Sequence, residues 1–244
     1  MKIRLPALAC VLSCCLLAPA VSAQSASPAP GEYLTERGWG RLLLKPAAAG
    51  GAQAFAIEAQ SANAHVCMVE GSLREQQARI ETGGSEPACV IDFTPTAGGL
   101  RVTPTTPAAC RYFCGEGAQF SGLYLQPAPG CRSAEVKQAR ASFKQQFDKK
   151  DYARARATLA PVLAACAKLL TESDQGWVRN DLALTLYRLG DAAECRRVLA
   201  PLAELVALSD EQLRDTYAAA YVPTQERIAR ATRANLKLCG AGAK

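Results

Sequence analysis

The segment DYARARATLAPVL, residues 151–163, decides the fold of the second half of this 244-residue chain. It aligns without a gap with DAAECRRVLAPLA, residues 191–203, and the Leu-Ala-Pro triplets at 159–161 and 199–201 coincide. A helical pattern precedes each copy at matched positions. Two helices that recur at a fixed spacing of 40 residues predict a helical-repeat architecture.

The region around this repeat is rich in Ala, Leu, Arg and Glu, whereas Gly and Pro are scarce from about Ser133 onward. We predict helices over 133–148, 152–170, 175–189 and 192–205, with two more between 209 and 237. Residues 171–176 are predicted to form a loop, and Gly190 is expected to cap a helix C-terminus. Pro161 and Pro201 recur at the same place in the two copies, so a built-in kink is expected there.

Residues 133–206 resemble tetratricopeptide repeats. Leu182 and Ala183 stand where that family has its first-helix Leu and small residue. Gly190-Asp191 is similar to the family's turn between helices, and Cys195 occupies the position of its small second-helix Ala. The spacing departs from the family's roughly 34 residues, and the predicted loop accounts for the difference.

In that family the first helix of each unit lines a concave groove. The resemblance implies groove positions at Trp177, Asn180, Leu184, Tyr187 and Arg188 in the second copy and at Lys137, Arg140, Lys144 and Phe147 in the first. Such a groove would be basic with aromatic anchors, which suits an acidic or carboxylate-ended peptide. The alternative is that the apolar members belong to the core and the cations to a solvated face.

Residues 32–131 differ in composition, with many Gly, Pro and Thr and with short apolar runs. Strands are predicted in the runs 53–59, 65–69, 89–93, 100–103 and 120–125. About six to eight short strands of this kind make a small antiparallel barrel or sandwich. The predicted fold is therefore α+β, with a cysteine-rich β domain over 32–131 and a helical domain over 132–244.

Residues 1–23 are predicted to be a signal peptide. Two basic residues precede an apolar run over 5–17, and Val21-Ser22-Ala23 supplies the small residues for cleavage after Ala23. Cys14 permits a lipoprotein alternative. Residues 24–31 are expected to be a disordered leader, and no later segment is apolar enough to span a membrane. The composition looks bacterial, so the protein is expected to be periplasmic or secreted.

The chain has 11 cysteines, of which three lie in the predicted signal peptide. The remaining eight predict disulfides in an exported protein: Cys67, Cys89, Cys110, Cys114, Cys131, Cys166, Cys195 and Cys239. The β half holds five of them and the helical half three, so full pairing needs at least one bridge between the halves. Cys131 is the candidate for that bridge, and Cys67–Cys89 and Cys166–Cys195 are plausible local pairs.

The sequence offers little support for catalysis. Histidine occurs once, at His65, and a net charge of +6 is too small for a dedicated nucleic-acid binder. No nucleophile-elbow, zinc-protease or phosphate-loop motif is present. His65 and Cys67 share a strand face, but Cys67 is expected in a disulfide. We expect no enzyme activity, no cofactor, no bound metal and no nucleic-acid partner.

Phe120-Ser-Gly-Leu-Tyr124 is similar to the Ser-Gly-x-x-Tyr loop of small exported lysozyme inhibitors, although it is one residue short. In that family the Ser and Tyr engage the catalytic carboxylates of the hydrolase, so the resemblance implies this role for Ser121 and Tyr124. Removing one residue from an extended segment turns side chains to the other face. The alternative is that Gly122 permits a strand bend and Tyr124 packs in the core.

We therefore expect an exported, non-catalytic binding protein of the cell envelope. Its partner would be a protein or peptide, engaged through the helical groove, the β-domain loops or both. The alternative is an inhibitor of a lysozyme-like hydrolase that acts through the β domain. A third hypothesis, an envelope hydrolase, lacks a catalytic constellation in the sequence.

Overall fold

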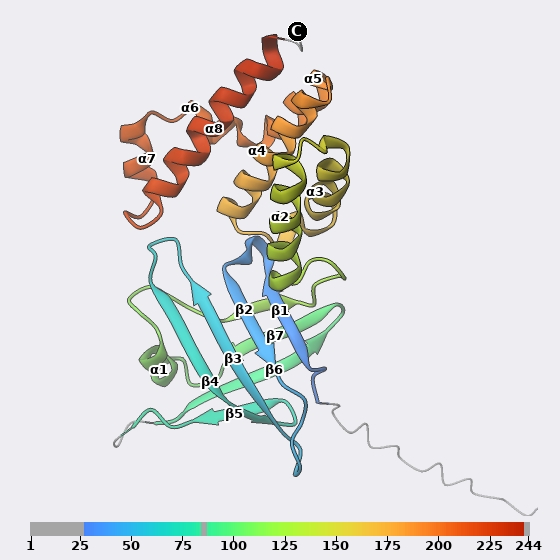
Figure 1. Ribbon diagram of the computed structural model, residues 1–244. Helices are drawn as coiled ribbons and strands as arrows, with labels where there is room; N and C mark the ends of the chain where they lie inside the picture. The colour runs from blue at the N-terminus through green and yellow to red at the C-terminus, as the bar shows by residue number, and fades with distance from the viewer. Residues whose placement is uncertain (1–26, 84–86, 242–244) are drawn as a thin grey trace, which may run out of the picture.

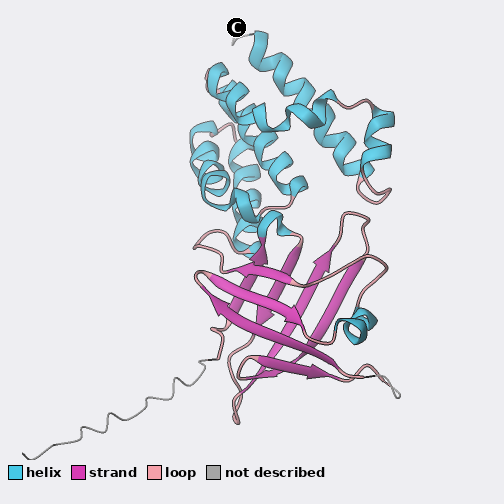
Figure 2. Cartoon of the chain, turned by 180° about the vertical axis from the view of Figure 1, so that it is seen from behind, coloured by secondary structure: helices cyan, strands magenta, loops and turns pink. Residues whose placement is uncertain are grey.

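The computed structural model describes residues 27–83 and 87–241. The predicted signal peptide and its cleavage site, with Cys10, Cys14 and Cys15, lie outside the described residues. Figures 1 and 2 show a β-barrel with helices stacked against one of its ends, so the predicted α+β class is confirmed. Among the helices of the described ranges, none is long and apolar enough to cross a membrane.

The sheet is a closed barrel in which every strand runs antiparallel to its neighbours. Its strands are β1 (Gly31–Thr35), β2 (Gly40–Leu44), β3 (Ala52–Gln60), β4 (Val66–Arg74), β5 (Gln77–Ile80), β6 (Cys89–Thr96), β7 (Gly99–Pro104) and β8 (Gly122–Leu125). β8 closes the barrel on β1 through the pairs Leu34–Leu125 and Thr35–Tyr124. Of the two predicted architectures, the barrel is the one observed.

Side chains that alternate along the strands fill the barrel. In β3, Phe55, Ile57 and Ala59 point inward and are buried, whereas Glu58 is exposed. The rings of Phe55 and Phe93 meet edge to face with their centroids 4.9 Å apart. The interior is therefore a packed core, as expected for a small closed barrel.

The helices are α1 (Pro107–Cys110), α2 (Ser133–Asp148), α3 (Tyr152–Cys166), α4 (Glu172–Arg188), α5 (Ala192–Leu199), α6 (Ala203–Ala207), α7 (Asp210–Thr216) and α8 (Val222–Ala241), and the 3-10 turns are η1 (Glu36–Gly38), η2 (Arg111–Phe113), η3 (Ala167–Leu169) and η4 (Ala200–Leu202). The loop predicted over 171–176 is wrong, because Thr171 caps α4 and accepts a hydrogen bond from the Asp174 amide at 3.0 Å. Pro161 lies inside α3 without ending it, whereas Pro201 lies in η4, which separates α5 from α6.

The C-terminal helix α8 packs across α4 and α5. Asn180 of α4 donates a hydrogen bond to Thr232 Oγ1 of α8 (2.8 Å), and Asn235 of α8 donates to Asn180 Oδ1 (3.0 Å). All three side chains are buried. The Cys195–Cys239 disulfide joins α5 to the C-terminal part of α8. The face of α4 that bears Asn180 is therefore covered by the last helix of the same chain.

Four disulfides join cysteines of the described residues, as predicted: Cys67–Cys114, Cys89–Cys110, Cys131–Cys166 and Cys195–Cys239. Cys131 forms the predicted bridge to the helical half through Cys166. The local pairs Cys67–Cys89 and Cys166–Cys195 are wrong. β5 lies between β4 and β6 in the barrel, so Cys67 and Cys89 are not on neighbouring strands. The end of α3 lies instead near the linker that carries Cys131.

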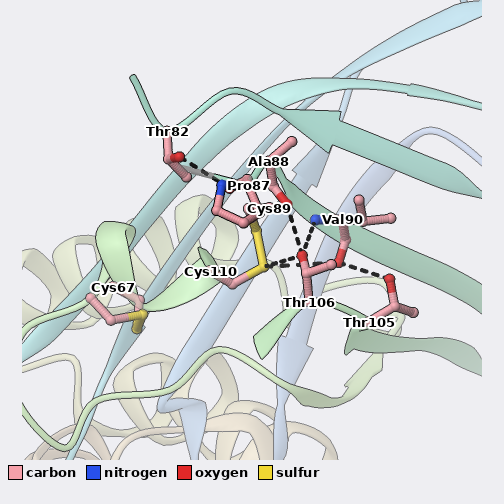
Figure 3. Close-up of a disulfide and its surroundings, with 10 residues drawn as sticks. Cys67, Thr82, Pro87, Ala88, Cys89, Val90, Thr105, Thr106 and Cys110 are labelled. Carbon is pink, nitrogen blue, oxygen red and sulfur yellow. Dashed lines mark hydrogen bonds between the residues drawn. A yellow bond between two sulfur atoms is a disulfide. The ribbon is translucent and has the colours of Figure 1, made fainter. Parts of the chain in front are cut away.

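The segment between β7 and β8 is fastened to the barrel at two points. Figure 3 shows the first, where Cys110 of α1 is bonded to Cys89 of β6. Thr106 Oγ1 accepts a hydrogen bond from the Val90 amide at 2.8 Å beside this disulfide. Cys114 makes the second attachment, to β4. Cys110 and Cys114 therefore serve two different strands and do not pair with each other.

Glu32 of β1 connects the barrel to the helices. Its carboxylate accepts hydrogen bonds from Arg41 Nε (2.6 Å) and from the backbone amide of Ser133 (2.9 Å), the first residue of α2. Burial acts to raise the pKa of Glu32, but these hydrogen bonds and the Arg41 charge outweigh it and hold the pKa below its usual range. Elsewhere, the Tyr221 hydroxyl donates to the Ser61 carbonyl oxygen at 3.0 Å.

The described part of the predicted leader contacts the barrel. Pro28 is buried, and its carbonyl oxygen accepts a hydrogen bond from the Gln53 amide at 3.0 Å. The Tyr33 hydroxyl donates to the Ala29 carbonyl oxygen at 2.7 Å. Residues 27–30 therefore differ from the predicted disorder, because polar side chains of β1 and β3 supply partners for their backbone.

Candidate functional site

The outer wall of β4 presents two large apolar side chains on one face. Val66 is 46% exposed and Met68 is 60% exposed. Cys67 between them is buried and is bonded to Cys114. The neighbouring backbone is held as well, because the Gly115 amide donates to the Val66 carbonyl oxygen at 2.9 Å. The disulfide therefore fixes the position of an exposed apolar pair.

Trp39 lies beside this pair, and β8 determines its position. A Cβ atom at Gly122 would lie 3.2 Å from Trp39 Cζ2 and 3.3 Å from Trp39 Cη2. The absence of a side chain at Gly122 therefore leaves room for the indole. The ring of Tyr124 supports it from the barrel interior, with the two ring centroids 6.1 Å apart.

Trp39, Val66 and Met68 line a hollow of about 350 Å³, together with the charged residues Arg41 and Glu58. Arg41 Nη1 and Glu58 Oε2 are 4.0 Å apart. An apolar centre beside paired charges matches the usual arrangement of a protein–protein interface, with its apolar core and polar rim. We call these five residues the β4 face.

A second hollow, of about 500 Å³, lies between the end of the barrel and the helices. Trp39 also lines this hollow, with Arg37 of η1 and Glu172 of α4. Arg37 Nη2 is 3.7 Å from Glu172 Oε2, and the Tyr217 hydroxyl donates to Glu172 Oε1 at 2.6 Å. Burial and the Glu172 carboxylate both raise the pKa of Tyr217, so its hydroxyl stays protonated. We call this hollow the barrel–helix cleft.

Gln225 of α8 lies in the wall of the cleft and is 3% exposed. Its Nε2 donates to Ser173 Oγ at 3.5 Å, which is the limit for a hydrogen bond. Its Oε1 accepts no hydrogen bond from any residue that the structure describes. Leaving a buried acceptor unpaired costs about 1–3 kcal/mol, so this atom needs a physical explanation.

The groove residues predicted on α4 divide into covered and accessible ones. Asn180 is buried against α8, and Trp177 packs against the small core that α6, α7 and α8 form. Leu184 and Tyr187 are half-buried, and Arg188 is exposed. The Arg188 guanidinium lies 5.9 Å from the centroid of the Tyr187 ring. Asn180 therefore has a role inside the helical core and does not face a partner.

The cations predicted on α2 lie on the surface, but two of them have carboxylate partners. Lys137 and Lys144 are exposed, and Lys144 Nζ is 2.7 Å from Asp148 Oδ2 one turn further on. Arg140 Nη1 is 3.1 Å from Asp174 Oδ1 of α4. These ion pairs reduce the positive charge that α2 offers to an acidic peptide.

The surroundings of Arg140 contain a second acid. Burial raises the pKa of Asp181 to about 6, and the Arg140 charge lowers it in part. Phe147, the remaining residue predicted for the groove, packs against the helical core. The predicted basic surface is therefore mixed in charge around Arg140.

The segment that resembles an inhibitor loop is part of the barrel. Tyr124 is fully buried, and its hydroxyl donates to the Phe120 carbonyl oxygen at 2.8 Å. Ser121 is half-buried and directly precedes β8. This placement matches the alternative in which Gly122 serves the strand and Tyr124 packs in the core. In addition, Gly122 and Tyr124 both contribute to the position of Trp39.

His65 is exposed, and its Nδ1 contacts the Glu116 carbonyl oxygen. Within residues 27–83 and 87–241, no group of three or more His, Cys, Asp or Glu side chains is arranged to hold a metal ion. No protein-family model, curated protein or solved structure matches the chain.

Sequence reasoning missed both hollows. A signal for the β4 face existed, because a half-buried strand should place polar residues outward, yet both Val66 and Met68 are apolar. No such signal existed for the cleft. Trp39, Glu172 and Gln225 are far apart in the chain, and only tertiary contacts bring them together.

Proposed function

We propose that this chain is an exported, non-catalytic binding protein of the bacterial cell envelope, and that its partner is a protein that docks on the β4 face. The observation that carries the proposal is the exposure of Val66 and Met68 beside Trp39. Large apolar side chains gathered on a surface mark interaction sites, and Met and Trp are enriched at interface cores. The disulfide behind the pair lowers the entropy cost of docking.

Export supports the same proposal. Four disulfides are typical of proteins in an oxidising compartment, which fits a periplasmic or secreted protein. The proposed cleavage after Ala23 rests on the sequence pattern alone. We also propose that the helical half is tetratricopeptide-like, supported by the consecutive helix pairs α2–α3 and α4–α5. Since α8 covers Asn180, the exposed Lys137, Lys144 and Arg188 would offer an acidic peptide only an outer surface.

Inhibition of a lysozyme-like hydrolase remains the alternative function. The burial of Tyr124 leaves Ser121 as the more accessible of the two residues implied by that resemblance. A lysozyme turbidity assay tests the alternative directly. A molar excess of this protein that leaves lysis unchanged would remove it.

The binding proposal is tested with the native exported protein, immobilised and exposed to periplasmic extract. Met68→Glu is the test variant, and Leu189→Glu is the matched control, because Leu189 is also exposed (40%) but lies at the end of α4. We expect wild type and control to retain the same protein, and Met68→Glu to retain it at least about tenfold less. The melting temperature should not change, because Met68 is exposed. Equal retention by all three would refute the proposal.

A further inference from the structure

The barrel–helix cleft carries chemistry that a partner on the β4 face does not use. The described residues offer the buried Gln225 side chain one hydrogen bond, between Nε2 and Ser173 Oγ. Whichever way the amide is turned, one of its two polar atoms stays unpaired. The atom is closed off from solvent, so a ligand group in the cleft would satisfy it once the Gln225 amide turns toward the cleft. Such a group must be able to act as either a donor or an acceptor.

The cleft has no net charge. Arg37 and Glu172 are the charged residues among the described residues that line it, and they lie 3.7 Å apart. The Tyr217 hydroxyl further occupies the Glu172 carboxylate. An anionic or cationic ligand would have to compete with this pair. The ligand that fits is therefore neutral.

Flat aromatic rings and polar groups form the wall. Trp39, Tyr217 and Tyr221 line the cleft, and the hydroxyls of both tyrosines donate to oxygen atoms of the protein. None of the described residues that line it is Leu, Ile, Val or Met. It therefore lacks the aliphatic pockets that usually hold peptide side chains.

We propose that the barrel–helix cleft binds a neutral saccharide, a ligand beyond the protein partner of the β4 face. The C–H face of a sugar ring packs on aromatic rings, and each sugar hydroxyl both donates and accepts hydrogen bonds. One hydroxyl thus satisfies Gln225 in either orientation of the amide. The volume of about 500 Å³ is typical of small-ligand pockets and admits a short oligosaccharide.

The test uses the native exported protein with Trp177→Phe, which leaves Trp39 as its single tryptophan. Maltotriose, cellotriose and triacetylchitotriose are the saccharide probes, and the neutral peptide Gly-Ser-Gly is the comparison. Binding is measured by Trp39 fluorescence and by titration calorimetry. We expect a saturable signal with at least one saccharide and none with the peptide.

Gln225→Leu should weaken saccharide binding at least about tenfold and leave the melting temperature unchanged or higher, because it removes the unpaired atom. A purely structural Gln225 would instead give a lower melting temperature and unchanged affinity. Gln138→Leu, at an exposed position of α2, is the matched control and should bind as wild type. Met68→Glu should also bind saccharide, which separates this proposal from the proposed function. The proposal is overturned if none of the three saccharides binds, if Gly-Ser-Gly binds in their place, or if Gln225→Leu binds as wild type.

Discussion

Replacing Asp181 with Asn should stabilise the protein at neutral pH. Burial raises the pKa of Asp181 from 3.8 to about 6, even though the Arg140 charge offsets part of the effect. At a pH between these two pKa values, Asp181 holds a proton in the folded protein that it has released in the unfolded chain. The stability of the wild type should therefore fall as the pH rises through this window, since folding is favoured where the folded state binds more protons.

The size of the effect follows from the shift. A difference of about two pKa units corresponds to about 3 kcal/mol between the two protonation states. Asn carries no titrating proton, so Asp181→Asn should not show this pH dependence. Relative to the wild type, the variant should be near neutral at about pH 4 and more stable by up to about 3 kcal/mol at about pH 8.

Urea unfolding followed by circular dichroism at both pH values measures this difference. Asp148→Asn is the control, because Asp148 is an exposed aspartate in an i,i+4 pair, and its removal should change the free energy of unfolding by no more than about 0.5 kcal/mol. An Asp181→Asn variant with the same relative stability at both pH values would refute the reasoning. So would a variant that is less stable than the wild type at about pH 8.

Three further predictions concern Glu32 between the barrel and the helices, the cations of α2, and the contact between Gly122 and Trp39. Glu32→Gln should lower the free energy of unfolding, measured with urea, by about 1–2 kcal/mol near pH 7. This loss should shrink as the pH falls through the lowered pKa of the wild-type carboxyl, and a loss that persists in acid would contradict the prediction. Arg140→Glu should lower the stability of the protein by about 1 kcal/mol because two acids surround this position, whereas Lys144→Glu should lower it by about 0.5 kcal/mol or less. Thermal melts that show equal losses for the two variants would make Arg140 an ordinary surface cation. Gly122→Ala should displace Trp39, which shifts its fluorescence emission and weakens partner retention; an unchanged spectrum would argue against the close contact.

Local sequence patterns were sufficient for most helices and for several strands. The segment 133–148 has an uninterrupted helical composition, and α2 has the predicted bounds. The start of α4 was misplaced because the Thr171 cap and its bond to Asp174 were not recognised. The cysteine pairing depended on strand order, which local patterns do not contain. The odd count in each half was nevertheless enough to require a bridge through Cys131 or an equivalent residue.

The candidate site was harder to predict, because it depends on distant contacts. The resemblance to tetratricopeptide repeats placed Asn180 in a groove, but Thr232 and Asn235 of α8 bond to it and bury it. The repeat alone could not reveal that a later helix covers this face. In the same way, Gln225 has no distinctive local pattern, and its unpaired atom becomes evident only from the three-dimensional packing.

The most direct test of the central claim, that a protein binds the β4 face, is photo-crosslinking in the periplasm. A benzophenone amino acid in place of Met68 should form a discrete adduct with another envelope protein. The same group in place of Leu189 should not form that adduct. Identical adducts at both positions, or none at position 68, would contradict the account.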